Sequence, residues 1–207
     1  MIEVLAKGIG VGFAIAAPVG PIGLLCIRRT WADGRAIGLA TGLGAATADG
    51  VYGFMVAGGL AVTGLLVEHA RPLSFVGGLL IVWLGVQAIR AYFARGEMKP
   101  AAAGEMRGVA SAFATTFLLT LSNPMTILSF VALVTGLGPS LAASASAPFV
   151  LVAGVFTGSA LWWVILVHLA SFARARTTPE ALRWIDLASG GLLIAWGAAI
   201  VGGAVLG

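Results

Sequence analysis

Charged residues are scarce in this sequence: Asp, Glu, Lys and Arg make up 10% of its 207 residues, against 59% for the hydrophobic types. Soluble domains carry about a quarter charged residues, and a chain of this length in water could not bury so much apolar surface. The mean hydropathy of +1.03 therefore indicates a protein embedded in a lipid bilayer. The net charge of +4 comes from short basic segments, a pattern typical of membrane topology and not of nucleic-acid binding.

Cysteine and the common enzyme motifs are also missing. Cys26 is the only cysteine, so one chain can form neither an internal disulfide nor a dithiol redox pair. The sequence contains no Cys-x-x-Cys, His-Glu-x-x-His or Gly-x-Ser-x-Gly motif and no phosphate-binding glycine loop. We therefore expect no enzyme, no cofactor and no resident metal.

The sequence does contain long apolar stretches. A helix needs about 20 apolar residues to cross the hydrocarbon core of a bilayer. Six stretches fit this length, at residues 8–27, 36–67, 73–89, 110–135, 149–171 and 187–206. The first is read as a span and not as a cleaved signal, because Arg28 and Arg29 follow it in place of small residues. These stretches predict an all-α integral membrane protein with six transmembrane helices.

Basic residues alternate between the segments that join these stretches. One set of connections holds ten of the twelve: Arg28, Arg29, Arg35, Arg90, Arg95, Lys99, Arg107, Arg174, Arg176 and Arg183. The other set holds Lys7 and Arg71. Basic loops stay in the cytoplasm. The pattern predicts a multi-pass protein of the plasma (inner) membrane with both termini outside.

The two halves of the chain repeat a short motif. Residues 77–83 and residues 190–196 are identical at six of seven positions, and each copy ends in a tryptophan, Trp83 or Trp196. The repeat divides the chain into residues 1–107 and 108–207, with three spans in each. Because three is an odd number, the second half must be inverted. Inverted repeats are typical of secondary transporters, with the binding site near mid-membrane.

Proline interrupts the first and the fourth span, at corresponding places in the two halves. The interrupting residues are Pro18, Gly20 and Pro21 in the first span and Ser122, Asn123 and Pro124 in the fourth. Proline removes a backbone donor, and the freed carbonyl groups must line protein or a water-filled cavity. A half-helix that starts after such a break would direct its N–H groups toward an anion, such as a substrate carboxylate.

Asp49 is the one charged residue within the second span, with Thr47 two positions before it. A carboxylate at mid-bilayer is costly, and intramembrane acids are usually functional. We expect Asp49 to face the bundle interior and to serve proton coupling or to pair with a substrate amine; a purely structural hydrogen bond is the alternative. Tyr52 and Trp163 are secondary candidates, and Trp163 would either line a cavity or pack against lipid.

Three motifs together resemble the lysine-exporter (LysE) type amino-acid translocators. They lie at residues 18–23, 47–50 and 121–124, in that order along the chain. The resemblance implies a six-helix inner-membrane exporter of amino acids or related small molecules, driven by an ion gradient. By motif match it assigns site roles to Pro18, Gly20, Pro21, Asp49, Asn123 and Pro124.

The leading functional hypothesis is thus a proton-coupled exporter of amino acids or related metabolites. Its partners would be a small-molecule substrate, protons or other ions, the lipid bilayer and, through Gly-x-x-x-Gly spacings, a second copy of the chain. One alternative is a metal-cation transporter on the same scaffold, although Asp49 is a single carboxylate where metals need several ligands. Another is a membrane scaffold without transport activity.

Overall fold

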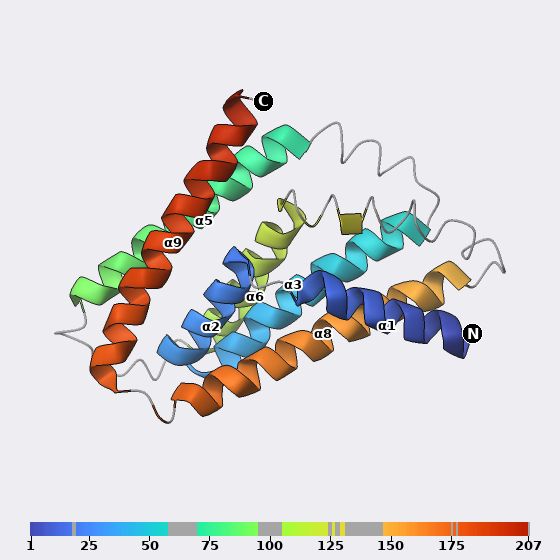
Figure 1. The fold of residues 1–207 in the computed structure, drawn as a ribbon, viewed down its shortest axis with the longest axis horizontal. Coiled ribbons are helices and arrows are strands. Elements are labelled where there is room, and N and C mark those ends of the chain that lie inside the picture. Colours follow the sequence, from blue (N-terminus) through green and yellow to red (C-terminus); the bar gives the residue numbers. More distant parts are fainter. Residues whose placement is uncertain are drawn as a thin grey trace.

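The structure is a computed structural model that describes residues 1–17, 20–57, 70–94, 105–123, 126, 129–130, 147–174, 176 and 178–206. Within these residues the regular structure is entirely α-helical. The helices are α1 (Ile2–Ala16), α2 (Pro21–Ala32), α3 (Arg35–Ala57), α5 (Ala70–Ala94), α6 (Glu105–Leu121), α8 (Ala147–Arg174) and α9 (Pro179–Leu206), shown in Figure 1.

Three of these helices are long and apolar enough to cross a bilayer alone, over Arg71–Arg90, Ala147–Arg174 and Leu187–Leu206. A fourth span results if α1 and α2 are counted as one broken helix. Large apolar side chains cover the outer faces, and Trp83 is 51% exposed and Trp196 46% exposed. Exposed apolar surface on this scale requires a lipid environment. The chain is therefore an all-helical, multi-pass membrane protein, and its arrangement as six spans stays a prediction.

The helix is interrupted at the predicted position in the first span. α1 ends at Ala16, α2 begins at Pro21, and the two are bent by 80° relative to each other. Gly20 caps α2 in an extended conformation, and Leu24 N–H donates to its carbonyl oxygen at 3.0 Å. In the second half, α6 ends at Leu121. Pro18 and Pro124 themselves lie outside the described residues.

Glycines bring pairs of helices into close contact. α5 and α9 pack side by side in opposite directions (Figure 1), with Gly85 against Gly190 and Gly78 against Gly197. A Cβ on Gly85 would lie 2.8 Å from the Gly190 carbonyl oxygen, so a larger residue there would separate the helices. α1 packs against α8 through a similar small-residue contact, but those two helices run in the same direction. Such contacts are the usual means of helix association in lipid.

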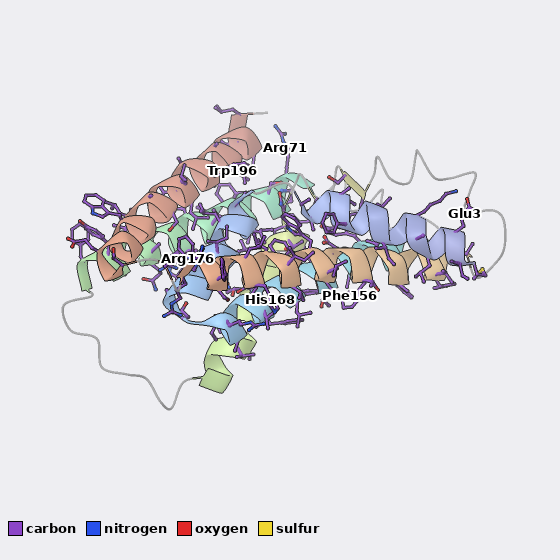
Figure 2. All side chains as sticks on the ribbon, turned by 60° about the horizontal axis from the view of Figure 1, so that its bottom comes forward. Glu3, Arg71, Phe156, His168, Arg176 and Trp196 are labelled. Carbon is purple, nitrogen blue, oxygen red and sulfur yellow. The ribbon has the colours of Figure 1, made fainter. Side chains whose placement is uncertain are left out.

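The ends of α2, α5 and α8 and the starts of α3 and α9 meet at one end of the molecule. Trp31 donates from its indole to the Ala170 carbonyl oxygen at 2.6 Å, and Arg35 contacts His168. Tyr92 lies against Trp184. His168 and Arg176 lie toward this end of α8, whereas Glu3 lies at the opposite end of the molecule (Figure 2). Because Arg35 and Arg176 of the predicted basic loops lie here, we call it the basic end.

Candidate substrate site

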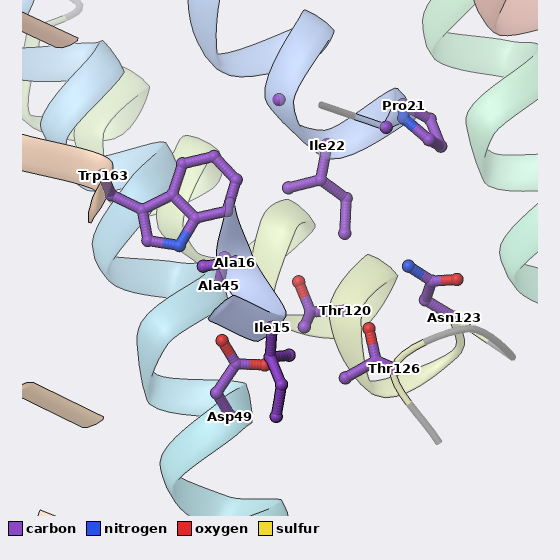
Figure 3. Close-up of a pocket in the computed structure, with 12 residues that line it drawn as sticks. Ile15, Ala16, Pro21, Ile22, Ala45, Asp49, Thr120, Asn123, Thr126 and Trp163 are labelled. Carbon is purple, nitrogen blue, oxygen red and sulfur yellow. The ribbon is translucent and has the colours of Figure 1, made fainter. Parts of the chain in front are cut away.

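A small cavity of about 70 Å³ lies where the broken helix meets α3, α6 and α8 (Figure 3). That volume is well below the roughly 300 Å³ at which the usual range of small-molecule sites begins. The lining residues come from both halves of the chain: Ile15, Ala16, Gly20, Pro21, Ile22, Gly23, Ala45, Asp49, Thr120, Asn123, Thr126 and Trp163. Polar groups from both halves thus converge on one partly open space inside the bundle.

Asp49 supplies the acidic group of the cavity. It is 4% exposed and lies in the middle of α3, so it faces the interior of the bundle as the sequence predicted. The Ser159 hydroxyl donates to Asp49 Oδ2 at 2.6 Å, and the Trp163 indole N–H donates to Ser159 Oγ at 3.2 Å. Among the described residues no Lys, Arg or His nitrogen lies within 4.0 Å of the carboxylate. The carboxylate is therefore held by a neutral donor and stays available to a cation or a proton.

The helix interruptions supply the other polar groups. The first turn of α2 borders the cavity at Gly20, Pro21 and Ile22, so the positive end of that helix dipole points at it. From the other half come Thr120 and Asn123, at the end of α6. The Asn123 backbone N–H donates to the Thr120 carbonyl oxygen at 3.2 Å, which closes the last turn of the helix. The cavity thus faces an acid on one side and a helix N-terminus on the other.

The structure brings half of the ten predicted site residues together at the cavity. Gly20, Pro21, Asn123 and Trp163 join Asp49 at the cavity. Thr47 donates to the Leu43 carbonyl oxygen and borders a surface groove on another face of α3. Ser122 donates to the Leu118 carbonyl oxygen and does not line the cavity. Pro18 and Pro124 lie outside the described residues.

Tyr52 is nearly fully buried next to the cavity and does not line it. Its hydroxyl donates to the Leu121 carbonyl oxygen, and its ring stacks on Phe130 with centroids 5.3 Å apart. Tyr52 therefore ties α3 to the end of α6, which holds Asn123 in position.

Three site residues were not predicted. Thr120 and Thr126 line the cavity, and Ser159 binds Asp49. Thr120 precedes Asn123 by three residues, a spacing that places both on one helix face. That spacing was a usable signal for Thr120, whereas the pairing of Ser159 with Asp49 depends on how two distant helices meet.

The described residues contain no group of three or more His, Cys, Asp or Glu side chains that could hold a metal ion. The metal-cation alternative requires such a set of ligands. It stays a prediction without support from this part of the chain.

An interrupted helix beside a buried acid, in an all-helical bundle with apolar outer faces, is typical of membrane transporters as a class. The sequence comparison then identifies the family. The pattern of LysE type translocators matches residues 13–202, and the chain belongs to that family.

One curated relative is similar over nearly its whole length. It is 27% identical over 195 residues, which cover 90% of this chain and 89% of the relative. It comes from Bacillus subtilis (strain 168), where it is named "Putative amino acid efflux protein YcgF". No solved structure matches the chain.

Proposed function

We propose that this protein exports amino acids or closely related small metabolites and that the proton gradient drives the export. The observation that carries the proposal is the cavity in which Asp49 faces the first turn of α2. Membership of the translocator family and the name of the Bacillus subtilis relative support the same substrate class.

The cavity matches the two charged groups of an amino acid. Asp49 pairs with the substrate ammonium group, or takes up a proton when the substrate has left. The substrate carboxylate lies at the N-terminus of α2, where backbone N–H groups and the helix dipole favour an anion. Asn123 and Thr120 supply neutral hydrogen bonds that fix the orientation of the substrate. Because a cavity of about 70 Å³ is smaller than the usual small-molecule site, it must widen to accept a substrate.

The contacts between α3 and α8 support two inverted halves, residues 1–107 and 108–207. Asp49 and Ser159 are 110 positions apart and touch each other. The contact of Gly42 with Trp163 has a counterpart in the contact of Gly53 with Val152. Adding 110 to the residue number of Gly42 gives that of Val152, and subtracting 110 from that of Trp163 gives that of Gly53. Two helices related by a two-fold axis in the membrane plane produce such paired contacts.

The basic end faces the cytoplasm in this proposal, and the protein resides in the plasma (inner) membrane. Arg35, Arg174 and Arg176 belong to this end, and basic segments are retained inside. Both termini then lie outside. A reporter enzyme fused after Gly207 and active only outside the cytoplasm is expected to be active; activity confined to the cytoplasm would reverse the orientation.

The central experiment replaces Asp49 by asparagine, which keeps the shape and removes the charge. Proteoliposomes are loaded with a mixture of the twenty protein amino acids, a pH gradient is imposed, and released amino acids are measured by mass spectrometry. We expect Asp49→Asn to abolish the release that the gradient drives, with thermal stability preserved.

The matched control is Thr47→Val, which lies on the same helix and faces the surface groove. It is expected to transport like the unmodified protein. Undiminished gradient-driven release by Asp49→Asn would remove the proton-coupling role, and no release of any amino acid by the unmodified protein would refute the function.

A further inference from the structure

Arg29 lies in the interior of the bundle, contrary to the sequence prediction that placed it in a cytoplasmic loop. It stands in the last turn of α2 before the helix ends at Ala32, and it is only 9% exposed. The prediction failed because a charged residue that follows an apolar stretch usually marks the end of a span. Here the helix continues, and its inner face carries the guanidinium group toward α3 and α6.

The guanidinium group is surrounded by neutral oxygen atoms. Nη1 lies 3.1 Å from Thr116 Oγ1, 3.2 Å from the Ala112 carbonyl oxygen and 3.3 Å from Thr41 Oγ1. Nη2 donates to Thr115 Oγ1 at 3.1 Å. Asp33, on the same turn of the chain, attracts the charge electrostatically, but among the described residues no carboxylate oxygen comes within 4.0 Å.

Such an environment is unusual for a buried cation. Removing a charge from water costs several kcal/mol, and a buried arginine ordinarily recovers that cost by pairing with a carboxylate. Hydroxyl and carbonyl groups form weaker bonds with the guanidinium group than a carboxylate does. The site therefore has the geometry to accept a carboxylate that the described chain does not itself supply.

Buried threonines connect Arg29 with the cavity. Thr116 and Thr120 occupy successive turns of α6; Thr116 binds Arg29, and Thr120 lines the cavity. Thr41 binds Arg29 from α3, eight residues before Asp49 on the same helix. Eight helical residues span about 12 Å, which is longer than the separation of the ammonium and carboxylate groups of one α-amino acid. Arg29 and Asp49 are thus too far apart to bind one α-amino acid at the same time, and buried threonines lie between them.

We propose that Arg29 is a reception site for the carboxylate of the exported amino acid, between the basic end and the cavity. When the site is empty, the bonds from Arg29 to the threonines of α3 and α6 block the route of the substrate from the basic end to the cavity. An arriving carboxylate accepts two parallel N–H bonds from the guanidinium group, replaces the threonine hydroxyls and releases α2 from α6. This inference rests on the proposed function and adds a second, earlier contact with the same substrate.

The test uses everted membrane vesicles, in which the basic end faces the medium. The probe is the protein amino acid that vesicles take up fastest from a mixture of all twenty, and its competitor is the corresponding amide, which lacks the carboxylate. We expect Arg29→Gln to raise the KM for the amino acid about tenfold or more, since bonds to charged groups contribute about 1.5–3 kcal/mol. The inhibition constant of the amide should stay within about twofold, and Arg29→Lys should recover part of the loss.

Arg28→Gln is the matched control, because it removes the same charge one position earlier on the same helix. Its KM should stay near that of the unmodified protein. An unchanged KM in Arg29→Gln, or equal changes for the amino acid and the amide, would overturn the reception site while leaving the proposed function intact. If unmodified vesicles take up no amino acid, both proposals fail.

A second measurement tests whether Arg29 blocks this route, and it can be made even if Arg29→Gln transports poorly. A Thr120→Cys variant, made in a chain whose native Cys26 is replaced by alanine, is exposed to a charged thiol reagent from the basic end. Labelling should increase in the presence of the amino acid, should not increase with the amide, and should be high without ligand once Arg29→Gln is added. If labelling changes neither with the amino acid nor with Arg29→Gln, Arg29 does not block the route.

Discussion

The pair α5 and α9 differs sharply from the bundle formed by α1, α2, α3, α6 and α8. Of the ten buried polar or charged residues among those that the structure describes, only Ser74 and Ser189 belong to the pair, while the bundle holds the buried charges Arg29 and Asp49 together with most of the buried threonines. The pair is joined by close contacts at glycines. The buried polar groups that the proposed function requires therefore lie in the bundle and not in the pair.

The largest effect on stability is expected at the glycine contact of the pair. A Cβ on Gly85 would come within 2.9 Å of backbone atoms of both Gly190 and Ile194, whereas a Cβ on Gly191 would meet nothing within 4 Å. Gly85→Val should therefore cost about 3 kcal/mol through overpacking and lower the melting temperature in detergent. Gly191→Val should melt like the unmodified protein, and equal melting of the two variants would show that this contact does not support the fold.

The bundle should respond in the opposite way, with loss of transport at preserved stability. Ser159→Ala removes the hydroxyl that donates to Asp49. Hydrogen bonds to charged groups contribute about 2 kcal/mol, or roughly thirtyfold in rate. The variant should therefore show a transport rate lower by that factor in the proteoliposome assay. Thr157→Val, whose parent hydroxyl binds the Ala153 carbonyl oxygen on an exposed face, provides the comparison and should transport normally.

A smaller effect is expected one step farther from the acid. Trp163→Phe keeps an aromatic wall for the cavity but removes the indole N–H that donates to Ser159. A neutral hydrogen bond contributes about 1 kcal/mol, which corresponds to roughly fivefold in transport rate. A larger loss than in Ser159→Ala would show that the ring contacts the substrate directly.

The smallest effects should come from the matched tryptophans of the pair. Trp83 and Trp196 stand at equivalent places of the sequence repeat, and both are about half exposed on the outer faces. Replacing either one by leucine should change stability by less than about 0.5 kcal/mol, as for other surface positions. Melting curves that differ strongly between the two variants would argue against their equivalence.

The features that could be predicted from the sequence are those that depend on residues close together along the chain. The all-helical membrane class follows from the long apolar stretches, the interruption before Pro21 from proline and glycine together, and the interior position of Asp49 from the cost of a charge in lipid. Each of these inferences needs only local composition and the physics of one helix. The structure agrees with all three.

The missed features depend on the way distant helices meet. Ser159 is an ordinary hydroxyl residue in an apolar helix, and nothing in its sequence neighbours reveals that it binds Asp49. Arg29 was misplaced for a related reason. Whether an arginine at the end of a span turns outward or inward depends on the hydroxyls that another helix offers, here Thr115 and Thr116 of α6.

The indole of Trp163 gives the protein a natural optical probe. Its N–H is coupled through one serine hydroxyl to the carboxylate of Asp49, so any cation or proton that reaches that carboxylate alters the surroundings of the ring. Emission from this tryptophan, isolated by subtracting the Trp163→Phe spectrum, would then follow occupancy of the cavity in real time without an attached dye.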